Sequence, residues 1–440
     1  MMEKDREITE ELFAFIESAP TAFHAVDEMK QKLDETGYIQ LLEGECWNLQ
    51  KGGKYYVIRN GSSILAFRIP KEDFRGFQIM ASHSDSPSFM VKENPEMTVG
   101  DAYVKLNVEK YGGMLCAPWF DRPLSVAGRL VLKKEDHIAV KLVSADRNLV
   151  MIPNLAIHLN REANDGYKYN VQKDMLPLFA MADGDRSLRN VIAEAAGVKE
   201  EDIIGSDLYL YNRMHGTIWG ANEEFISIGR LDDLQCAFAS FQAFLAAEDG
   251  ESIPVHCVFD NEEIGSGTKQ GAASTFLYDT LSRIVESLGG SGSDYRRALA
   301  SSFMISADNA QAVHPNYPEK YCPTNRVFLN RGIALKYSAN QKYTTDGVAA
   351  ALFTQFCEYA DVPYQVFYNR SDMPGGSTLG NLSGNQVAVK CVDIGLPQLA
   401  MHSPYETAGI RDTAYLIRVA KQFYESSVVE KGYGTYEICR

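Results

Sequence analysis

The sequence predicts an α/β protein in which a mixed sheet carries helices on both faces and is interrupted by a mostly β insertion. Residues 1–91 and 230–440 alternate between helical patterns and short apolar runs, which implies crossover connections between strands. Residues 92–229 instead contain short β-like runs separated by Gly, Pro and Asn. The length of 440 residues allows two or three domains. We therefore expect one main domain formed by 1–91 and 230–440, and a second, inserted domain at 92–229.

Each expected helix or strand is predicted from the spacing of its apolar residues, which is typical of that type of secondary structure. Helical spacing of apolar residues predicts helices at Glu10–Glu17, Ala22–Glu35, Leu234–Ala247, Thr275–Leu288, Thr345–Tyr359 and Asp412–Ser427. Apolar runs predict main-domain strands at Tyr55–Arg59, Ser63–Arg68, Phe77–Ala81, Val255–Phe259, Phe303–Ser306, Gly332–Lys336, Gln365–Tyr368 and Gln386–Asp393. Strands of the insertion are expected at Tyr103–Val108, Gly128–Leu132, Ile138–Val143 and Leu208–Tyr211. The Gly-rich segment Gly289–Ser293 is expected to be a flexible surface linker.

Composition excludes several classes of partner. A formal net charge of −15 argues against nucleic acid and anionic membranes. The charged amphipathic start is not a signal core, and no apolar run approaches the roughly 18 residues of a membrane span. The eight cysteines are scattered and form no C-x-x-C pair, which favours a reducing cytoplasm.

Two adjacent glutamates, Glu262 and Glu263, directly follow the apolar run Val255–Phe259. Burying two neighbouring carboxylates is costly unless a cation compensates their charge. One glutamate could bind a metal ion while the other stays unligated and acts as a general base, as a metallohydrolase requires. The alternative is a surface loop that happens to be acidic.

Five ligand-type segments fall at the ends of expected strands or at the start of a helix. They are His83-Ser84-Asp85, Asp232-Asp233, Glu262-Glu263, Asp308 and His402. Because ligands of open α/β sheets bind at the carboxyl ends of strands, these segments are expected to meet in one crevice. Two histidines and three carboxylates suit two divalent ions about 3.5–4 Å apart, bridged by one carboxylate. Asp85 could accept the free ring N–H of His83 and so fix its tautomer.

Each segment also has an ordinary structural interpretation. His83 and Asp85 could be a hydrogen-bonded loop pair, and Asp232-Asp233 could cap a helix. Asp308 and His402 could be simple turn and loop residues. The joint occurrence of the five segments favours the metal site. The sequence contains no G-x-S-x-G elbow, Walker loop or H-E-x-x-H motif that would suggest another chemistry.

These segments resemble the aspartyl aminopeptidases of the M18 family, which are dinuclear zinc exopeptidases. The resemblance extends from Ser18 to the C-terminal helix. Its most specific stretches are Ser82–Pro87, Trp119–Arg122, Asn154–Leu159, Arg230–Asp233, Asp260–Ser266, Ser306–Asp308, Ala312–Tyr317 and Gln398–Ser403. It implies a zinc-exopeptidase-like catalytic domain, a dimerisation and lid domain at 92–229, and a homododecamer built from dimers.

The resemblance also implies a role for individual residues. Asp232 would bridge two ions, Glu263 and His402 would complete one ion's ligands, and His83 and Asp308 the other's. Glu262 would act as base and acid when a metal-bridging hydroxide attacks the first peptide bond, with Asp85 supporting the site. His158 would reach into the neighbouring subunit's site. Lys336 would meet an acidic substrate side chain, with His314, Gly376 and Met401 in the same pocket. Zn²⁺ is the expected ion, although the ligand set would also accept Mn²⁺ or Co²⁺.

Three positions depart from the family pattern. Asp233 stands where asparagine is usual, Gly375 where cysteine is common, and Pro123 where an acidic residue is frequent. The first two leave the ligand set intact but bear on substrate preference. Two alternatives therefore stay open: a dinuclear aminopeptidase or deacylase for neutral N-terminal residues, and a shell-forming assembly protein with a vestigial site.

Overall fold

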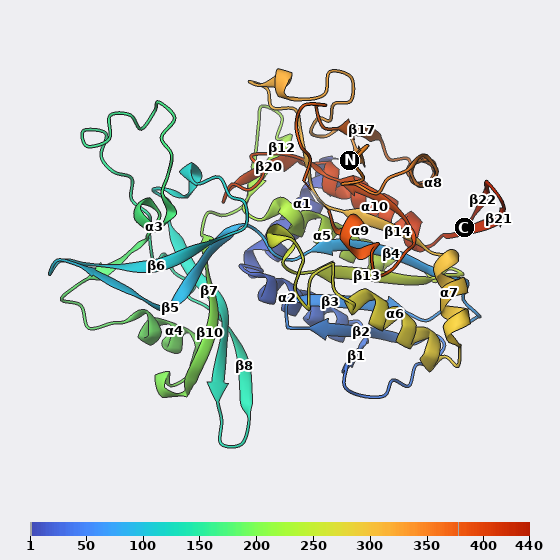
Figure 1. Cartoon of the computed structure of the whole chain (residues 1–440), viewed down its shortest axis with the longest axis horizontal. Coiled ribbons are helices and arrows are strands. Elements are labelled where there is room, and N and C mark those ends of the chain that lie inside the picture. The colour runs from blue at the N-terminus through green and yellow to red at the C-terminus, as the bar shows by residue number, and fades with distance from the viewer. Residues whose placement is uncertain (1, 377) are drawn as a thin grey trace.

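The computed structural model describes residues 2–376 and 378–440, and its centre is a nine-stranded mixed sheet (Figure 1). The strand order is β1-β2-β3-β13-β4-β14-β18-β16-β17. In that order the strands span Ile39–Leu41, Lys54–Arg59, Ser63–Arg68, Ile253–Phe259, Phe77–His83, Phe303–Ala307, Lys390–Gly395, Ile333–Tyr337 and Tyr364–Tyr368. The four central strands β13, β4, β14 and β18 are parallel, so their carboxyl ends lie along one edge.

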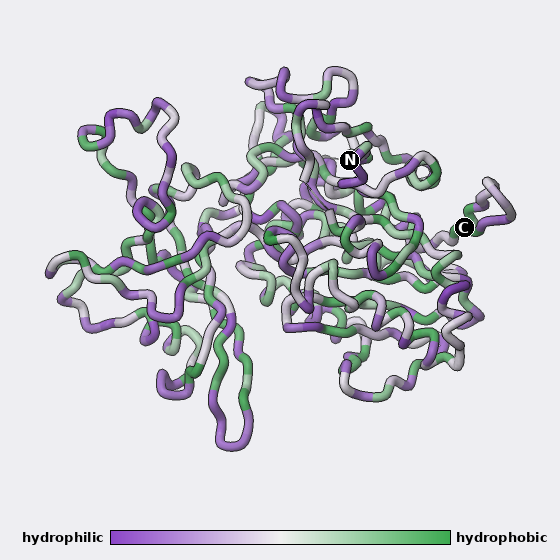
Figure 2. The backbone as a smooth tube through the Cα atoms, in the orientation of Figure 1, coloured by the Kyte–Doolittle hydropathy of each residue, from purple (hydrophilic) through white to green (hydrophobic). Residues whose placement is uncertain are grey.

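Helices cover both faces of this sheet. One face packs against α1 (Met2–Ser18), α2 (Ala22–Glu35), α5 (Leu231–Ala246), α8 (Gly347–Tyr359) and α10 (Asp412–Tyr424). The other face packs against α6 (Phe276–Ser287), α7 (Gly292–Ala300) and α9 (Leu379–Ser383). The buried face of α5 carries Phe238, Phe241 and Phe244, which explains why this segment folds as a core helix. Figure 2 shows the apolar colouring concentrated in this body and the polar colouring at protruding loops.

The insertion forms a separate antiparallel sheet with its own core, on the left of Figure 1. Its order is β8-β7-β10-β5-β6-β9, with strands at Ile138–Ser144, Leu124–Lys133, Ile203–Asn212, Ser88–Val99, Tyr103–Tyr111 and Leu178–Met181. Two short helices, α3 (Val171–Asp174) and α4 (Leu188–Ala196), belong to the same part of the chain.

A third, five-stranded sheet joins the end of the insertion to the main body. Its order is β11-β12-β20-β19-β15, with strands at Thr217–Trp219, Phe225–Ile228, Glu406–Gly409, Pro397–Leu399 and Ala310–Gln311. The C-terminus ends in the hairpin of β21 (Ser427–Gly432) and β22 (Thr435–Cys439). No helix among the described residues is long and apolar enough to cross a membrane.

Two local expectations were wrong. The expected linker Gly289–Ser293 is a loop only up to Ser291, and α7 begins at Gly292, because Ser291 accepts the backbone N–H of Asp294 and forms a capping box with it. The expected strand Gln386–Asp393 begins only at Lys390, since Gln386 and Val387 close turns onto Ser383. Both errors concern how a segment begins, where local hydrogen bonds override composition.

Candidate metal centre

The side chains expected to bind metal converge at the carboxyl edge of the central parallel strands. His83 is the last residue of β4, Asp308 follows β14, and Glu262 and Glu263 follow β13. Asp232 lies in the first turn of α5, and His402 lies just beyond β19. Asp232, Asp308, Glu262, Glu263 and His402 line one cavity of about 380 Å³.

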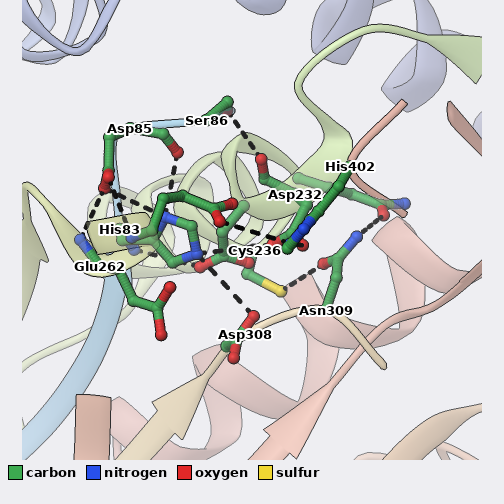
Figure 3. Close-up of polar contacts among 12 residues, drawn as sticks. His83, Asp85, Ser86, Asp232, Cys236, Glu262, Asp308, Asn309 and His402 are labelled. Carbon is green, nitrogen blue, oxygen red and sulfur yellow. Dashed lines mark hydrogen bonds and ion pairs between the residues drawn. The ribbon is translucent and has the colours of Figure 1, made fainter. Parts of the chain in front are cut away.

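The carboxylate of Asp232 lies between the two histidines. Its Oδ1 is 3.4 Å from Nε2 of His83, and its Oδ2 is 3.5 Å from Nε2 of His402. His83 Nε2 is also 3.8 Å from Asp308 Oδ1, and His402 Nε2 is 3.4 Å from Glu263 Oε2. The structure therefore places Asp232 between two clusters of ligand atoms, one containing His83 and Asp308 and the other containing Glu263 and His402. Figure 3 shows how His83, Asp232, Asp308 and His402 point toward one another.

The negative charges of this cluster and its carboxylate oxygens without hydrogen-bond partners suit divalent cations. Oδ1 of Asp232 and Oε1 of Glu263 are buried and accept no hydrogen bond from the described residues. Burial raises the pKa of Glu263, and the negative charge of Asp232 raises it further. Burial also acts to raise the pKa of Asp232, but the neighbouring imidazoles of His402 and His83 hold it below its ordinary value. Zinc and similar ions are bound in proteins by carboxylate oxygens and imidazole nitrogens, which are the groups gathered here.

The loop that carries the two glutamates is held by Asp85. The carboxylate of Asp85 accepts the backbone N–H groups of Glu262 and Glu263, each at 3.1 Å. Nδ1 of His83 lies 3.1 Å from the carbonyl oxygen of Asp85 and 3.4 Å from its Oδ1. Asp85 therefore contacts both a histidine of the cluster and the glutamate loop. The carboxylate of Glu262 makes none of the contacts drawn in Figure 3 and points beside His83 and Asp308.

The insertion contributes two further groups that the sequence did not single out. The hydroxyl of Tyr111 donates to Oδ2 of Asp85 at 2.7 Å, and Nδ1–H of His402 donates to the carbonyl of Gly113. The second contact directs Nε2 of His402 toward Asp232 and Glu263. Gly112 and Gly113 directly follow β6, and glycines at the end of a strand signal close backbone approach.

The expected substrate residues are distributed unevenly. Gly376 and Met401 line the cavity, as does Lys336, which is only 3% exposed. His314 is half-buried, accepts the backbone N–H of Asn316, and is absent from the cavity lining. His158 is exposed in the loop between β8 and α3 of the insertion, outside this cavity. Within one chain, the structure therefore brings three of these five residues to the cavity.

A mixed sheet with a histidine–carboxylate cluster at its carboxyl edge defines a metal-dependent hydrolase. Residues 15–424 match the sequence model of the Aminopeptidase I zinc metalloprotease (M18) family, and the chain belongs to that family. It is thus a metalloaminopeptidase, and the fold expected from the sequence is confirmed.

Similarity to individual proteins extends over nearly the whole chain. A probable M18 family aminopeptidase 2 of Clostridium novyi is 46% identical and covers 94% of this chain and 98% of its own. The protein in a cryo-EM structure of the Ape4 and Nbr1 complex is 34% identical, with a TM-score of 0.93 over 97% of this chain and 86% of its own. A structure of the S. cerevesiae mApe1 dodecamer is 27% identical, with a TM-score of 0.84 over 95% of this chain and 96% of its own.

Proposed function

We propose that this metalloaminopeptidase prefers peptides that begin with Asp or Glu. The observation that carries the preference is the ammonium group of Lys336 in the cavity wall. Its Nζ donates to the carbonyl of Asn309 at 2.9 Å and lies 3.4 Å from Oδ2 of Asp308. An ammonium has three N–H donors, so one stays available for a substrate carboxylate. A buried positive charge beside the reaction site would favour an acidic first residue.

We infer two divalent ions per chain. His83 and Asp308 would hold one, Glu263 and His402 would hold the other, and Asp232 would bridge them. The two oxygens of Asp232 face different histidines, which supports the bridging role. Zn²⁺ agrees with the family description, and the same oxygen and nitrogen ligands would accept Mn²⁺ or Co²⁺.

Divalent ions in this site would supply an activated hydroxide nucleophile and polarise the peptide carbonyl. The chain itself moves the protons. Glu262 takes a proton from the attacking water and passes it to the leaving amine. Burial raises the pKa of Glu262 to about 8, and the nearby charges of Asp308 and Asp85 add to the effect of burial. Asp232 and Glu263 would also attract the free α-amine of the substrate, which accounts for cleavage at the N-terminus.

Elemental analysis combined with a dipeptide panel tests this proposal. Freshly purified protein should contain two divalent ions per chain and should cleave Asp- and Glu-terminated dipeptides faster than Leu- or Lys-terminated ones. Equal cleavage of the Leu-terminated dipeptide would favour the alternative specificity for neutral residues. Fewer than one ion per chain would favour a vestigial site in an assembly protein.

Lys336 has two separable effects on the reaction, because it contacts Asp308 as well as the cavity. The Lys336→Met variant should lower kcat/KM for Asp-terminated substrates about 10- to 100-fold more than for Leu-terminated ones, the range of a lost charged hydrogen bond. Lys342→Met removes an exposed lysine from the loop that follows β16 and should lower kcat/KM for neither substrate. An equal loss for both substrates would mean that Lys336 serves only Asp308.

We further propose that residues 92–229 act as a dimerisation and lid domain and that the protein assembles as a homododecamer built from dimers. The His158 loop exposes Leu155, Ile157 and Leu159 at 58%, 50% and 75%, which suits burial against another subunit. A dodecamer has been described for the structural neighbour mApe1. His158→Ala and Glu262→Gln variants, each inactive alone, should regain partial activity when their subunits are mixed and reassembled. Absence of any rescue would refute a shared site.

The cysteines indicate the redox state of the compartment in which the protein works, and the net charge indicates which partners it can bind. All eight cysteines are free thiols, which supports our proposal of a reducing cytoplasmic compartment. The net charge of −15 supports peptides, in place of nucleic acid or anionic membranes, as the partners.

A further inference from the structure

Glu406 is a buried carboxylate that contacts two of the metal-site residues through their backbones. It is the first residue of β20 and is 1% exposed. Its Oε2 accepts the backbone N–H of Asp232 at 3.0 Å, and its Oε1 accepts the backbone N–H of His402 at 2.7 Å. Each carboxylate oxygen therefore binds a different segment of the candidate metal centre.

The position of β20 explains why one side chain reaches both segments. β20 lies between β12 and β19 in the five-stranded sheet, and Glu406 pairs with Ile228 at the end of β12. The chain continues from β12 into Asp232 and from β19 into His402. Both ligand-bearing segments therefore leave the sheet on the same side as Glu406.

The backbone in both segments needs support. Arg230 has φ of 61° two residues before Asp232, and His402 itself has φ of 65°. L-residues rarely adopt this left-handed region, and such strained turns persist when surrounding contacts determine them. A carboxylate suits this task because both of its oxygens accept hydrogen bonds, whereas an amide offers only one accepting oxygen.

We propose that Glu406 is a positioning residue that holds Asp232 and His402 at metal-binding distance. The inference rests on the proposed metal centre and concerns chiefly the ion held by Asp232, Glu263 and His402. In Glu406→Gln the amide nitrogen faces one of the two backbone N–H groups, so that one segment loses its acceptor. Asp232 belongs to both ligand clusters and His402 to only one, so the affinity loss should be larger for the ion that His402 holds.

The test is a metal titration of the full-length chain after chelator treatment. Zn²⁺ binding to wild type and Glu406→Gln would be measured by chelator competition, with Co²⁺ absorption as a second readout. The variant should keep one ion within about threefold of the wild-type affinity and lose about 10- to 100-fold in affinity for the other, as seen when groups behind metal ligands are changed. Excess Zn²⁺ should restore much of its activity.

Asp412→Asn is the matched control. Asp412 is also fully buried and accepts a backbone N–H, from Asn330 at 2.8 Å, but it contacts none of the proposed ligands. This variant should lose thermal stability and keep both metal affinities.

If Glu406→Gln does not fold, Glu406→Asp retains the charge but is too short to reach both N–H groups, and it should show the same selective loss.

The outcomes separate the two proposals. A folded Glu406 variant with both affinities unchanged overturns the positioning role while leaving the metal centre standing. Equal weakening of both affinities would overturn the positioning of His402 and leave only that of Asp232, which belongs to both ligand clusters. Wild-type protein that binds fewer than one ion overturns the metal centre itself.

Discussion

The hydroxyl of Tyr111, in the last residue of β6, donates a hydrogen bond to Oδ2 of Asp85 at 2.7 Å. The same hydroxyl accepts a hydrogen bond from the side chain of Asn261 at 2.8 Å. Because Asp85 also holds the backbone N–H groups of Glu262 and Glu263, a residue of the insertion is one contact away from the proposed base. The inserted sheet is thereby joined to the chemistry of the main sheet by a side-chain hydrogen bond.

Removing this hydroxyl should slow the reaction without removing metal. We expect Tyr111→Phe to lower kcat about tenfold, since a hydrogen bond to a charged group contributes about 1.5–3 kcal/mol and the two backbone N–H groups still hold Asp85. Tyr209→Phe is the control, because Tyr209 packs edge-to-face on Tyr111 at 5.7 Å without bonding to Asp85 among the described residues. Steady-state kinetics with metal analysis would measure both, and an unchanged kcat for Tyr111→Phe would contradict the connection.

Glu262 and Glu263 are adjacent but should respond differently to the same substitution. Glu262→Gln should retain both ions and lose about 10²- to 10⁴-fold in kcat, the usual contribution of a general acid–base group. Glu263→Gln removes a proposed ligand and should weaken metal binding as well. Metal content and single-turnover rates would be measured on the two variants side by side. Near-normal turnover in Glu262→Gln would show that another group is the base.

Any side chain at Gly112 would make a close steric contact with Glu263, a proposed metal ligand. It has φ of +76°, and a Cβ there would lie 3.1 Å from Cβ of Glu263. Gly112→Ala should therefore displace Glu263 and weaken metal binding about tenfold, in addition to a backbone cost of about 1–2 kcal/mol. Gly100→Ala is the control, because Gly100 has φ of +57° and no atom within 4 Å of a Cβ. Equal metal affinities in the two variants would argue against a contact with Glu263.

His256 should make the protein less stable in mild acid. It is fully buried on β13 between Phe241 and Phe244, and burial lowers the pKa of its imidazole to about 3. The unfolded chain binds this proton near pH 6.5, whereas the folded chain does not. The contribution of His256 is therefore complete above pH 6.5 and is lost as the pH falls, by up to about 1.4 kcal/mol per unit.

The comparison for this prediction is His256→Phe, which cannot take up the proton. The midpoint of thermal unfolding should fall less steeply between pH 6.5 and 5 in the variant than in the wild type. His137→Phe changes an exposed histidine and should leave the wild-type slope unaltered. Parallel slopes for His256→Phe and wild type would show that His256 does not contribute.

Much of the fold was predictable because its signals are local. The apolar runs of β13, β4 and β14 and the amphipathic pattern of α5 are periodic over a few turns or pleats, and they predicted these elements from the sequence. The start of α7 was missed although Ser291 and Asp294 carry the capping-box pattern, because glycine-rich composition was given more weight than that signal. The missed helix is short, and its loss would not have changed the site.

The amino-acid sequence by itself determined which side chains are available for chemistry: two histidines and a set of carboxylates at the ends of strands that must share one edge. Only the tertiary structure decided which atoms meet there. The carbonyl of Gly113 and the hydroxyl of Tyr111 reach this site from the insertion, and the carboxylate of Glu406, close to His402 in sequence, also binds the distant backbone N–H of Asp232. Backbone groups are the same in every residue, so no residue pattern marks which N–H or carbonyl will be bound until the sheets bring those segments together.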